Sequence, residues 1–160
     1  MVHIASSLFL EADPALKPFT GQARDVGRTV LIIRDERKNN VAFDMICGFL
    51  DLTAEHAGSG DDLARLLRAN RPVVVIADLD GERQDGCHVM MTVADFDRTL
   101  PVLLVTDPDP ALLGAVDAIQ EVWGLASVGF TSDPPDIGAL VDFLCRAGRD
   151  AGMSRMLRIQ

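Results

Sequence analysis

Acidic side chains follow the apolar runs of this chain, and their placement points to chemistry on a carboxylate. The apolar run Val73–Ala77 is followed directly by Asp78, with Asp80 two residues later, and an earlier apolar run is followed closely by Asp35. Carboxylates that meet at one edge of a sheet can hold Mg²⁺, which prefers oxygen ligands. We therefore interpret Asp35, Asp78 and Asp80 as an acidic pocket. Asp35 and Asp78 are its candidate metal ligands, if Asp78 accepts a phosphoryl group.

Phosphoryl chemistry on an aspartate needs a cation close by, because negative charge develops during the transfer. The chain has two lysines, Lys17 and Lys38, and both precede Asp78 in the sequence. Arg34 is the nearest cation in sequence terms. It can form a fixed salt bridge with Asp78 or Asp35, in place of both a metal and a lysine. Alternatively, its long stem carries the guanidinium to solvent.

Short apolar runs alternate with segments of helical periodicity, which is typical of a parallel sheet covered by helices. The expected strands are Thr29–Ile33, Leu52–His56, Val73–Ala77, Pro101–Thr106 and Val128–Thr131. The expected helices begin near Asn40, Asp61, Gly86, Pro110 and Asp136, and the last of them ends at Arg146. In the first helix, the residues at helical spacing that are expected to face inward are Val41, Met45, Ile46, Phe49 and Leu50. This alternation predicts an α/β fold with a five-stranded, doubly wound parallel sheet and right-handed crossovers.

Composition limits the class of protein and its partners. The 160 residues are 48% hydrophobic with a mean hydropathy of +0.18, which predicts one compact domain. We divide the chain into an N-terminal extension (1–27), the α/β domain (28–147) and a basic C-terminal tail (148–160). The net charge of -9 argues against nucleic acid or an anionic membrane as partner.

No apolar run approaches the roughly 20 residues that cross a bilayer, and we expect no signal peptide. The three cysteines have no metal-like spacing and are expected to be reduced thiols. Both features favour a cytoplasmic protein.

Residues 29–147 resemble the receiver domain of bacterial two-component response regulators. The segment Ile32–Glu36 resembles the first-strand acidic pair of that family, and the stretch from Pro72 to Gly86 matches its phosphoacceptor stretch in spacing. The resemblance implies a flavodoxin/CheY-like three-layer sandwich, with Asp78 at the phosphoacceptor position. It also implies switch roles for Thr106 and Phe130.

The chain departs from the pattern of the receiver family at two charged positions. Arg34 takes the place of the first acidic residue, and Asp133 takes the place of the lysine that follows the fifth strand. Crowded carboxylates disfavour an incoming phosphoryl dianion. We therefore interpret the chain as a degenerate receiver (a pseudo-receiver) that acts through protein contacts, is not an enzyme and needs no cofactor. The alternative is a working receiver that a histidine kinase phosphorylates on Asp78 with Mg²⁺.

The site also resembles that of one class of enzymes. Asp78-Leu79-Asp80-Gly81 resembles the first motif of haloacid-dehalogenase-type phosphatases, where the first aspartate is the nucleophile. Glu82 stands where that family has threonine, and the required lysine is absent after Asp78. This interpretation is therefore weaker than the alternative of a working receiver.

The receiver resemblance implies protein partners, such as a histidine kinase or an output protein, and a homodimer through the last two helices. The basic tail can dock on an acidic surface of a partner or a second copy. From charge crowding alone, we expect Asp78→Asn to change stability little or to raise it.

Overall fold

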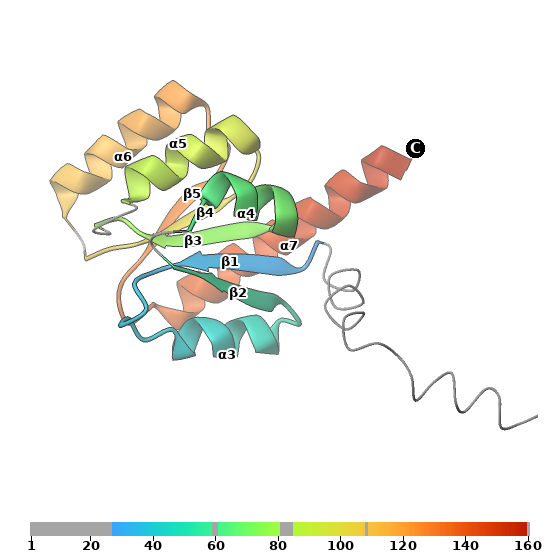
Figure 1. Ribbon diagram of the computed structural model, residues 1–160, viewed down its shortest axis with the longest axis horizontal. Coiled ribbons are helices and arrows are strands. Elements are labelled where there is room, and N and C mark those ends of the chain that lie inside the picture. Colours follow the sequence, from blue (N-terminus) through green and yellow to red (C-terminus); the bar gives the residue numbers. More distant parts are fainter. Residues whose placement is uncertain (1–26, 59–60, 81–84, 108, 160) are drawn as a thin grey trace, which may run out of the picture.

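A parallel sheet lies at the centre of the molecule (Figure 1). The computed structural model describes residues 27–58, 61–80, 85–107 and 109–159, with side chains up to Ala151. The strands are Thr29–Ile33 (β1), Thr53–Ala57 (β2), Val74–Asp78 (β3), Val102–Val105 (β4) and Val128–Thr131 (β5). Their order in the sheet is β2-β1-β3-β4-β5, and every pairing is parallel. The predicted five-stranded, doubly wound parallel sheet is confirmed.

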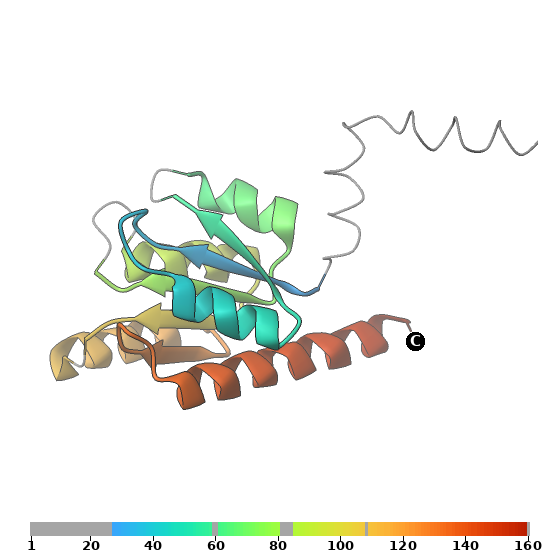
Figure 2. The same ribbon diagram turned by 90° about the horizontal axis from the view of Figure 1, so that it is seen from below.

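Among the described residues, five helices cover both faces of the sheet and complete a three-layer sandwich (Figures 1 and 2). They are Val41–Phe49 (α3), Leu63–Asn70 (α4), Gly86–Phe96 (α5), Pro110–Trp123 (α6) and Ile137–Ile159 (α7). Helices α4, α5 and α6 lie on one face, and α3 and α7 lie side by side on the other. Each of the first four strands is therefore followed by a helix that returns the chain to the start of the next strand.

Several of the acidic residues begin helices. Asp62, Asp85 and Asp109 each precede a helix and accept a hydrogen bond from a backbone amide of its first turn. A carboxylate at this position satisfies an otherwise unpaired amide and interacts favourably with the helix dipole. Part of the acidic excess of the chain is thus explained by helix capping rather than by chemistry.

Side-chain alternation along the strands builds two separate cores. On β1, Leu31 and Ile33 point toward α4, α5 and α6, while Val30 and Ile32 point toward α3 and α7. Every residue of β1 and β3 is buried, as expected of central parallel strands with helices on both faces. These two strands are the rigid base on which the candidate site stands.

Helix α3 does not bury the residues that its apolar spacing predicted. Phe43 and Cys47 are the buried residues, packed in the core that α3 shares with α7. Val41, Met45 and Phe49 are instead 58%, 67% and 82% exposed, and the other two members of the predicted face are only partly buried. The prediction was wrong because both sides of α3 are apolar, so that spacing alone could not choose between them.

Helix α7 is much longer than predicted. It begins at Ile137 as expected, but it continues through Arg146 to Ile159 without a break. The expected basic tail therefore begins inside a helix, whose end projects past the sheet in Figure 1. Gly148 and Gly152 lower helix propensity but do not stop a helix, and no proline follows Pro135.

The structure bears on two features expected from composition, the absence of a membrane-spanning run and the state of the cysteines. Among the described residues, no helix has the length and apolar character needed to cross a bilayer. The three cysteines are free thiols. Cys47 is buried, and Cys87 and Cys145 are half-buried. Burial raises the pKa of the Cys47 thiol to about 11, which makes it an unreactive core residue.

Candidate functional site

Charged side chains at the ends of three strands converge at the carboxyl edge of the sheet. Arg34 follows β1, Asp78 is the last residue of β3, and Asp133 lies two residues beyond β5. Ile32 and Ile76 lie two residues before Arg34 and Asp78, and both point into the core beneath α3 and α7. Because side chains two apart on a strand share a face, Arg34 and Asp78 point to this same side. Their strands are hydrogen-bonded neighbours.

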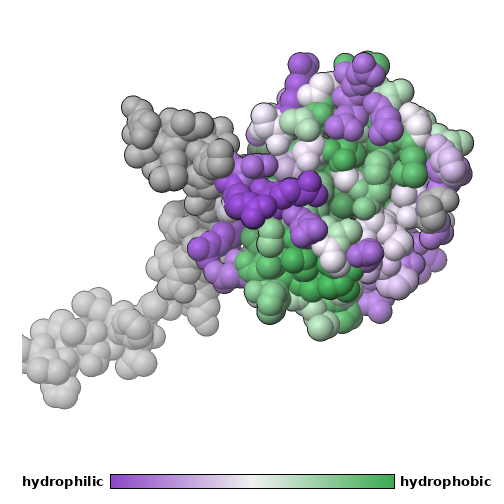
Figure 3. All heavy atoms as spheres, turned by 180° about the vertical axis from the view of Figure 1, so that it is seen from behind, coloured by the Kyte–Doolittle hydropathy of each residue, from purple (hydrophilic) through white to green (hydrophobic). Residues whose placement is uncertain are grey.

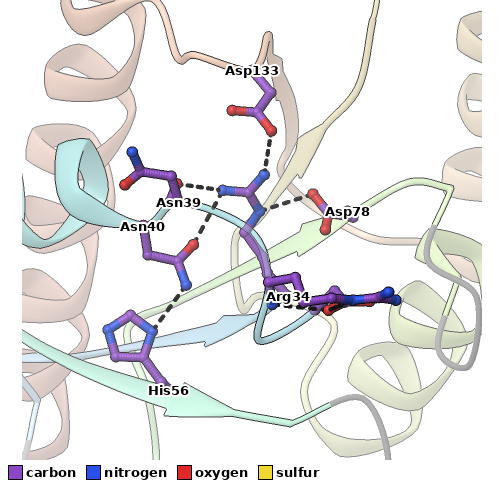
Figure 4. Close-up of polar contacts among 8 residues, drawn as sticks. Arg34, Asn39, Asn40, His56, Asp78 and Asp133 are labelled. Atoms are coloured by element: carbon purple, nitrogen blue, oxygen red, sulfur yellow. Dashed lines mark hydrogen bonds and ion pairs between the residues drawn. The ribbon is translucent and has the colours of Figure 1, made fainter.

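Arg34 bridges the two carboxylates (Figure 4). Its Nε donates to Asp78 Oδ1 at 2.9 Å, and its Nη2 donates to Asp133 Oδ2 at 2.7 Å. The Arg34 side chain is 0% exposed, whereas those of Asp78 and Asp133 are 8% and 37% exposed. One buried guanidinium thus connects the end of β3 to the loop between β5 and α7.

The third nitrogen of the Arg34 guanidinium, Nη1, also donates hydrogen bonds. Nη1 donates to Asn40 Oδ1 at 3.1 Å and to the backbone oxygen of Asn39 at 3.3 Å. The guanidinium carbon lies 5.1 Å from the centroid of the Phe43 ring, within the range of a cation–π contact. Of the two alternatives that the sequence left open, the structure has the salt bridge with Asp78 and not the solvent-exposed guanidinium.

The loop that carries Asp133 is held by hydrogen bonds of its own. Thr131 is buried at the end of β5, and its Oγ1 accepts a hydrogen bond from the amide of Asp136 at 3.1 Å. Ser132 Oγ donates to the backbone oxygen of Pro134 at 2.8 Å. These contacts fix the path of the chain between β5 and α7, so that Asp133 is presented to Arg34.

Burial and ion pairing shift the pKa of Asp78 in opposite directions. Removal from water raises the pKa of the Asp78 carboxyl, while the hydrogen bond and the positive charge of Arg34 oppose this rise. The burial effect is the larger of the two, so the neutral form of Asp78 is favoured more in the folded chain than in the unfolded chain. The ion pair therefore compensates only part of the cost of burying this carboxylate.

The other two acids of the predicted pocket have different surroundings. Asp35 accepts hydrogen bonds from the backbone amide of Arg37 at 2.9 Å and from its side chain at 3.1 and 3.3 Å. These bonds lower the pKa of Asp35 to about 2. Asp80 is exposed beyond the end of β3. Asp78 is thus the one member of the predicted trio that Arg34 engages.

The predicted switch residues lie near the same edge. Thr106 follows β4, and its Oγ1 donates to the backbone oxygen of Asp107 at 3.0 Å. Its amide donates to the backbone oxygen of Thr131 at 2.9 Å, which ties the end of β4 to the end of β5. Phe130 is partly buried and packs against the core beneath α4, α5 and α6. Their switch roles remain predictions.

The donor set at Asp78 does not fit a magnesium ion. Mg²⁺ is held in proteins by carboxylate oxygens together with several waters. Here the guanidinium of Arg34, a fixed cation, is bonded to Asp78 Oδ1, and Asp35 is bonded to Arg37. Within the described residues, no group of three or more His, Cys, Asp or Glu side chains converges as a metal site.

Sequence reasoning missed Asn40 as a site residue. Its side-chain oxygen binds Arg34, and its amide nitrogen lies 3.5 Å from His56 Nδ1. His56 Nε2 in turn lies 2.7 Å from Asp44 Oδ1 on α3. The available signal was the adjacency of Asn39 and Asn40 before α3, which we used only to place the start of the helix. Asn40 makes no side-chain cap bond.

The fold of this chain is similar to those of solved structures. No family model and no curated protein matches the chain. A response regulator receiver protein from Pseudomonas putida matches with 27% identity and a TM-score of 0.56, over 74% of this chain and 95% of that one. A response regulator receiver domain protein from Clostridium thermocellum matches with 18% identity and a TM-score of 0.63, over 78% and 97%. The signal receiver domain of a histidine kinase from Syntrophus aciditrophicus matches with 22% identity and a TM-score of 0.60, over 76% and 90%.

Proposed function

Because the chain folds as a response-regulator receiver domain, we propose that it is a pseudo-receiver of two-component signalling. In this proposal it acts through contacts with other proteins, without phosphorylation of Asp78 and without enzymatic activity of its own. The observation that carries the proposal is the buried ion pair between Arg34 and Asp78. A phosphoryl group on Asp78 would remove the carboxylate charge from this ion pair and bring its own negative charge, and no lysine follows Asp78 in the chain to neutralise that charge.

The charges of Arg34 and Asp133 support the same proposal. The resemblance to receivers implies an acidic residue at position 34 and a lysine at position 133. In this chain the two signs are exchanged, and the two side chains are bonded to each other at 2.7 Å. An exchange of this kind keeps an ion pair between the ends of β1 and β5 but replaces a metal-binding charge with a cation. Arg34 then holds the edge of the sheet in one arrangement without a metal or a phosphoryl group.

The partner surface that we propose is formed by α6, β5 and α7. Val122 on α6 is 79% exposed and Leu112 is 42% exposed, which supports a contact surface on this side. The partner is a histidine kinase, an output protein or a second copy of the chain. Analytical ultracentrifugation tests the homodimer. If the dimer forms through α6, Val122→Glu shifts the protein toward monomer, and Met91→Glu on α5 leaves its mass unchanged.

Beryllofluoride with Mg²⁺ tests whether Asp78 can act as a phosphoacceptor, because this anion mimics a phosphoryl group on an acceptor aspartate. Trp123 packs against the core beneath α4, α5 and α6, so its fluorescence reports rearrangement on that side. We expect no saturable change in the emission of the folded protein at millimolar Mg²⁺ and beryllofluoride. The Asp78→Asn variant, titrated in parallel, sets the signal of a site that cannot respond.

One outcome of this titration would overturn the proposal. A saturable, Mg²⁺-dependent change in wild type that is absent from Asp78→Asn would mean a working phosphoacceptor. A change of the same size in both proteins is a non-specific effect of the reagents and leaves no response assigned to Asp78, as the proposal requires.

A further inference from the structure

Helix α3 presents a row of apolar side chains to solvent. Val41, Met45 and Phe49 are spaced four residues apart, so they lie one above another along the helix. They are 58%, 67% and 82% exposed. Figure 3 shows the apolar surface that they form with their partly buried neighbours, low on the face of the molecule that α3 and α7 cover. We call Val41, Met45 and Phe49 the α3 row.

A row of three exposed apolar side chains differs from the singly scattered apolar residues of an ordinary protein surface. Single exposed apolar residues are normal, but contiguous apolar patches commonly mark a binding surface. The α3 row is the outward face of a helix whose opposite face, with Phe43 and Cys47, already packs in the core. The row therefore contributes nothing to the core and lacks a cover within the described part of the chain.

The N-terminal segment joins the fold beside this row. The backbone oxygen of Arg28 accepts a hydrogen bond from the amide of Thr53 at 2.8 Å, and the Arg28 side chain forms an ion pair with Asp51. Asp51 lies in the turn that directly follows α3. Residue 27 is therefore held at the end of α3 that carries Phe49, the most exposed member of the row.

The length and composition of residues 1–26 suit this position. Twenty-six residues can span up to about 90 Å when extended, whereas the nine residues of α3 extend over only about 14 Å. The segment contains the apolar run Leu8-Phe9-Leu10, together with Val2 and Ile4. It thus has both the reach and the apolar side chains to cover the row.

We propose that the N-terminal residues 2–10 of this chain pack on the α3 row of the same molecule. A second copy is a poorer occupant, because three side chains offer far less than the roughly 800 Å² per partner that a stable interface buries. A tethered segment needs less area, since its effective local concentration is in the millimolar range. The contact does not depend on whether Asp78 is phosphorylated.

Photo-crosslinking in the full chain tests this contact. A benzophenone amino acid replaces Phe49, which is exposed and tolerates the change without loss of core packing. The matched control carries the same group in place of Val122, which is 79% exposed on α6. After irradiation, mass spectrometry of the digested monomer identifies the linked peptide. We expect links from position 49 to residues 1–17 and none from position 122 to these residues.

A variant and an isotope-mixing experiment complete the test. Phe9→Asp should lower the yield of the link from position 49 about tenfold, which corresponds to roughly 1.4 kcal/mol of lost binding. Mixed ¹⁵N-labelled and unlabelled chains should give links only between peptides of the same isotope. Links between peptides of different isotopes would mean that a second copy covers the row. That result, or the absence of any link from position 49 to residues 1–17, would overturn the proposal.

Discussion

Arg34 Nε lies 2.9 Å from Asp78 Oδ1, in a contact whose two side chains are 0% and 8% exposed. A bond between the ends of β1 and β3 thus occupies the carboxylate on which a receiver would accept phosphate. Asp133 binds the same guanidinium through its Nη2 atom.

Substitutions at Asp78 should separate its charge from its hydrogen bond. We expect Asp78→Asn to change the free energy of unfolding by less than about 1 kcal/mol or to raise it. Burial already favours the neutral side chain, and the amide oxygen can still accept the hydrogen bond from Arg34 Nε. Asp78→Ala leaves Nε without an acceptor and should cost about 1–3 kcal/mol. Urea denaturation at pH 7 measures both, and a large loss in Asp78→Asn would contradict this account.

Removal of Arg34 should be far more damaging than either change. Arg34→Met fills a similar volume but leaves the buried Asp78 carboxylate unpaired, so we expect a loss of about 3–5 kcal/mol. Arg37→Met is the matched control, because the Arg37 side chain is 82% exposed and its partner Asp35 is only half-buried. Its effect in the same urea experiment should be under about 1 kcal/mol. Equal losses in the two variants would show that Arg34 has no special structural role.

The two carboxyl groups should titrate in opposite directions from the usual aspartate value. NMR of the side-chain carboxyl carbons should give a midpoint of about 2 for Asp35 and a midpoint above 3.8 for Asp78. Asp35 then contributes stability that is present above pH 3.8 and lost as pH falls through 2. Asp78 does the reverse, because its ionisation costs stability as pH rises from 3.8 through its folded pKa. A midpoint for Asp78 below 3.8 would mean that Arg34 outweighs burial.

Replacement by alanine should change the stability of the protein in opposite directions at two glycines, Gly86 and Gly114. A Cβ on Gly86 would lie 2.7 Å from Leu79 Cδ1 and 2.9 Å from Leu79 Cα, and backbone cannot move aside cheaply. Gly86→Ala should therefore cost about 1–3 kcal/mol. Gly114, in the middle of α6, has nothing within 4 Å of such a Cβ, so Gly114→Ala should add about 1 kcal/mol through helix propensity. Thermal unfolding of the two variants checks both signs, and destabilisation by Gly114→Ala would contradict the packing described here.

Alternation of apolar runs and helical periodicity was enough to predict the sheet, since central parallel strands are apolar throughout. Strands β1 and β5 were predicted with their observed bounds. The orientation of α3 was not predictable, because Phe43 and Val41 lie on different sides of a helix that is apolar on both. Only packing against α7 selects the buried side.

The parts of the site were predicted, and the salt bridge between Arg34 and Asp78 was one of the predicted alternatives, but the contact of Arg34 with Asp133 was not predicted. Strand ends identified Asp78 and the neighbourhood of Arg34, because ligand-facing residues follow parallel strands. The contact between Arg34 and Asp133 joins residues 99 positions apart and depends on how the chain turns after β5. No local pattern specifies that turn. Asn40 was missed for the same reason, since its role depends on where Arg34 points.

The central claim is that Arg34 replaces phosphorylation at Asp78. Intact mass spectrometry after incubation with Mg²⁺ and acetyl phosphate tests it most directly, with the double variant Arg34→Asp/Asp133→Lys treated in parallel. That variant restores the charges that the resemblance to receivers implies at both positions. We predict no mass gain in the folded wild-type protein and the gain of one phosphoryl group in the double variant. A phosphoryl group on wild-type Asp78, lost in Asp78→Asn, would contradict the account.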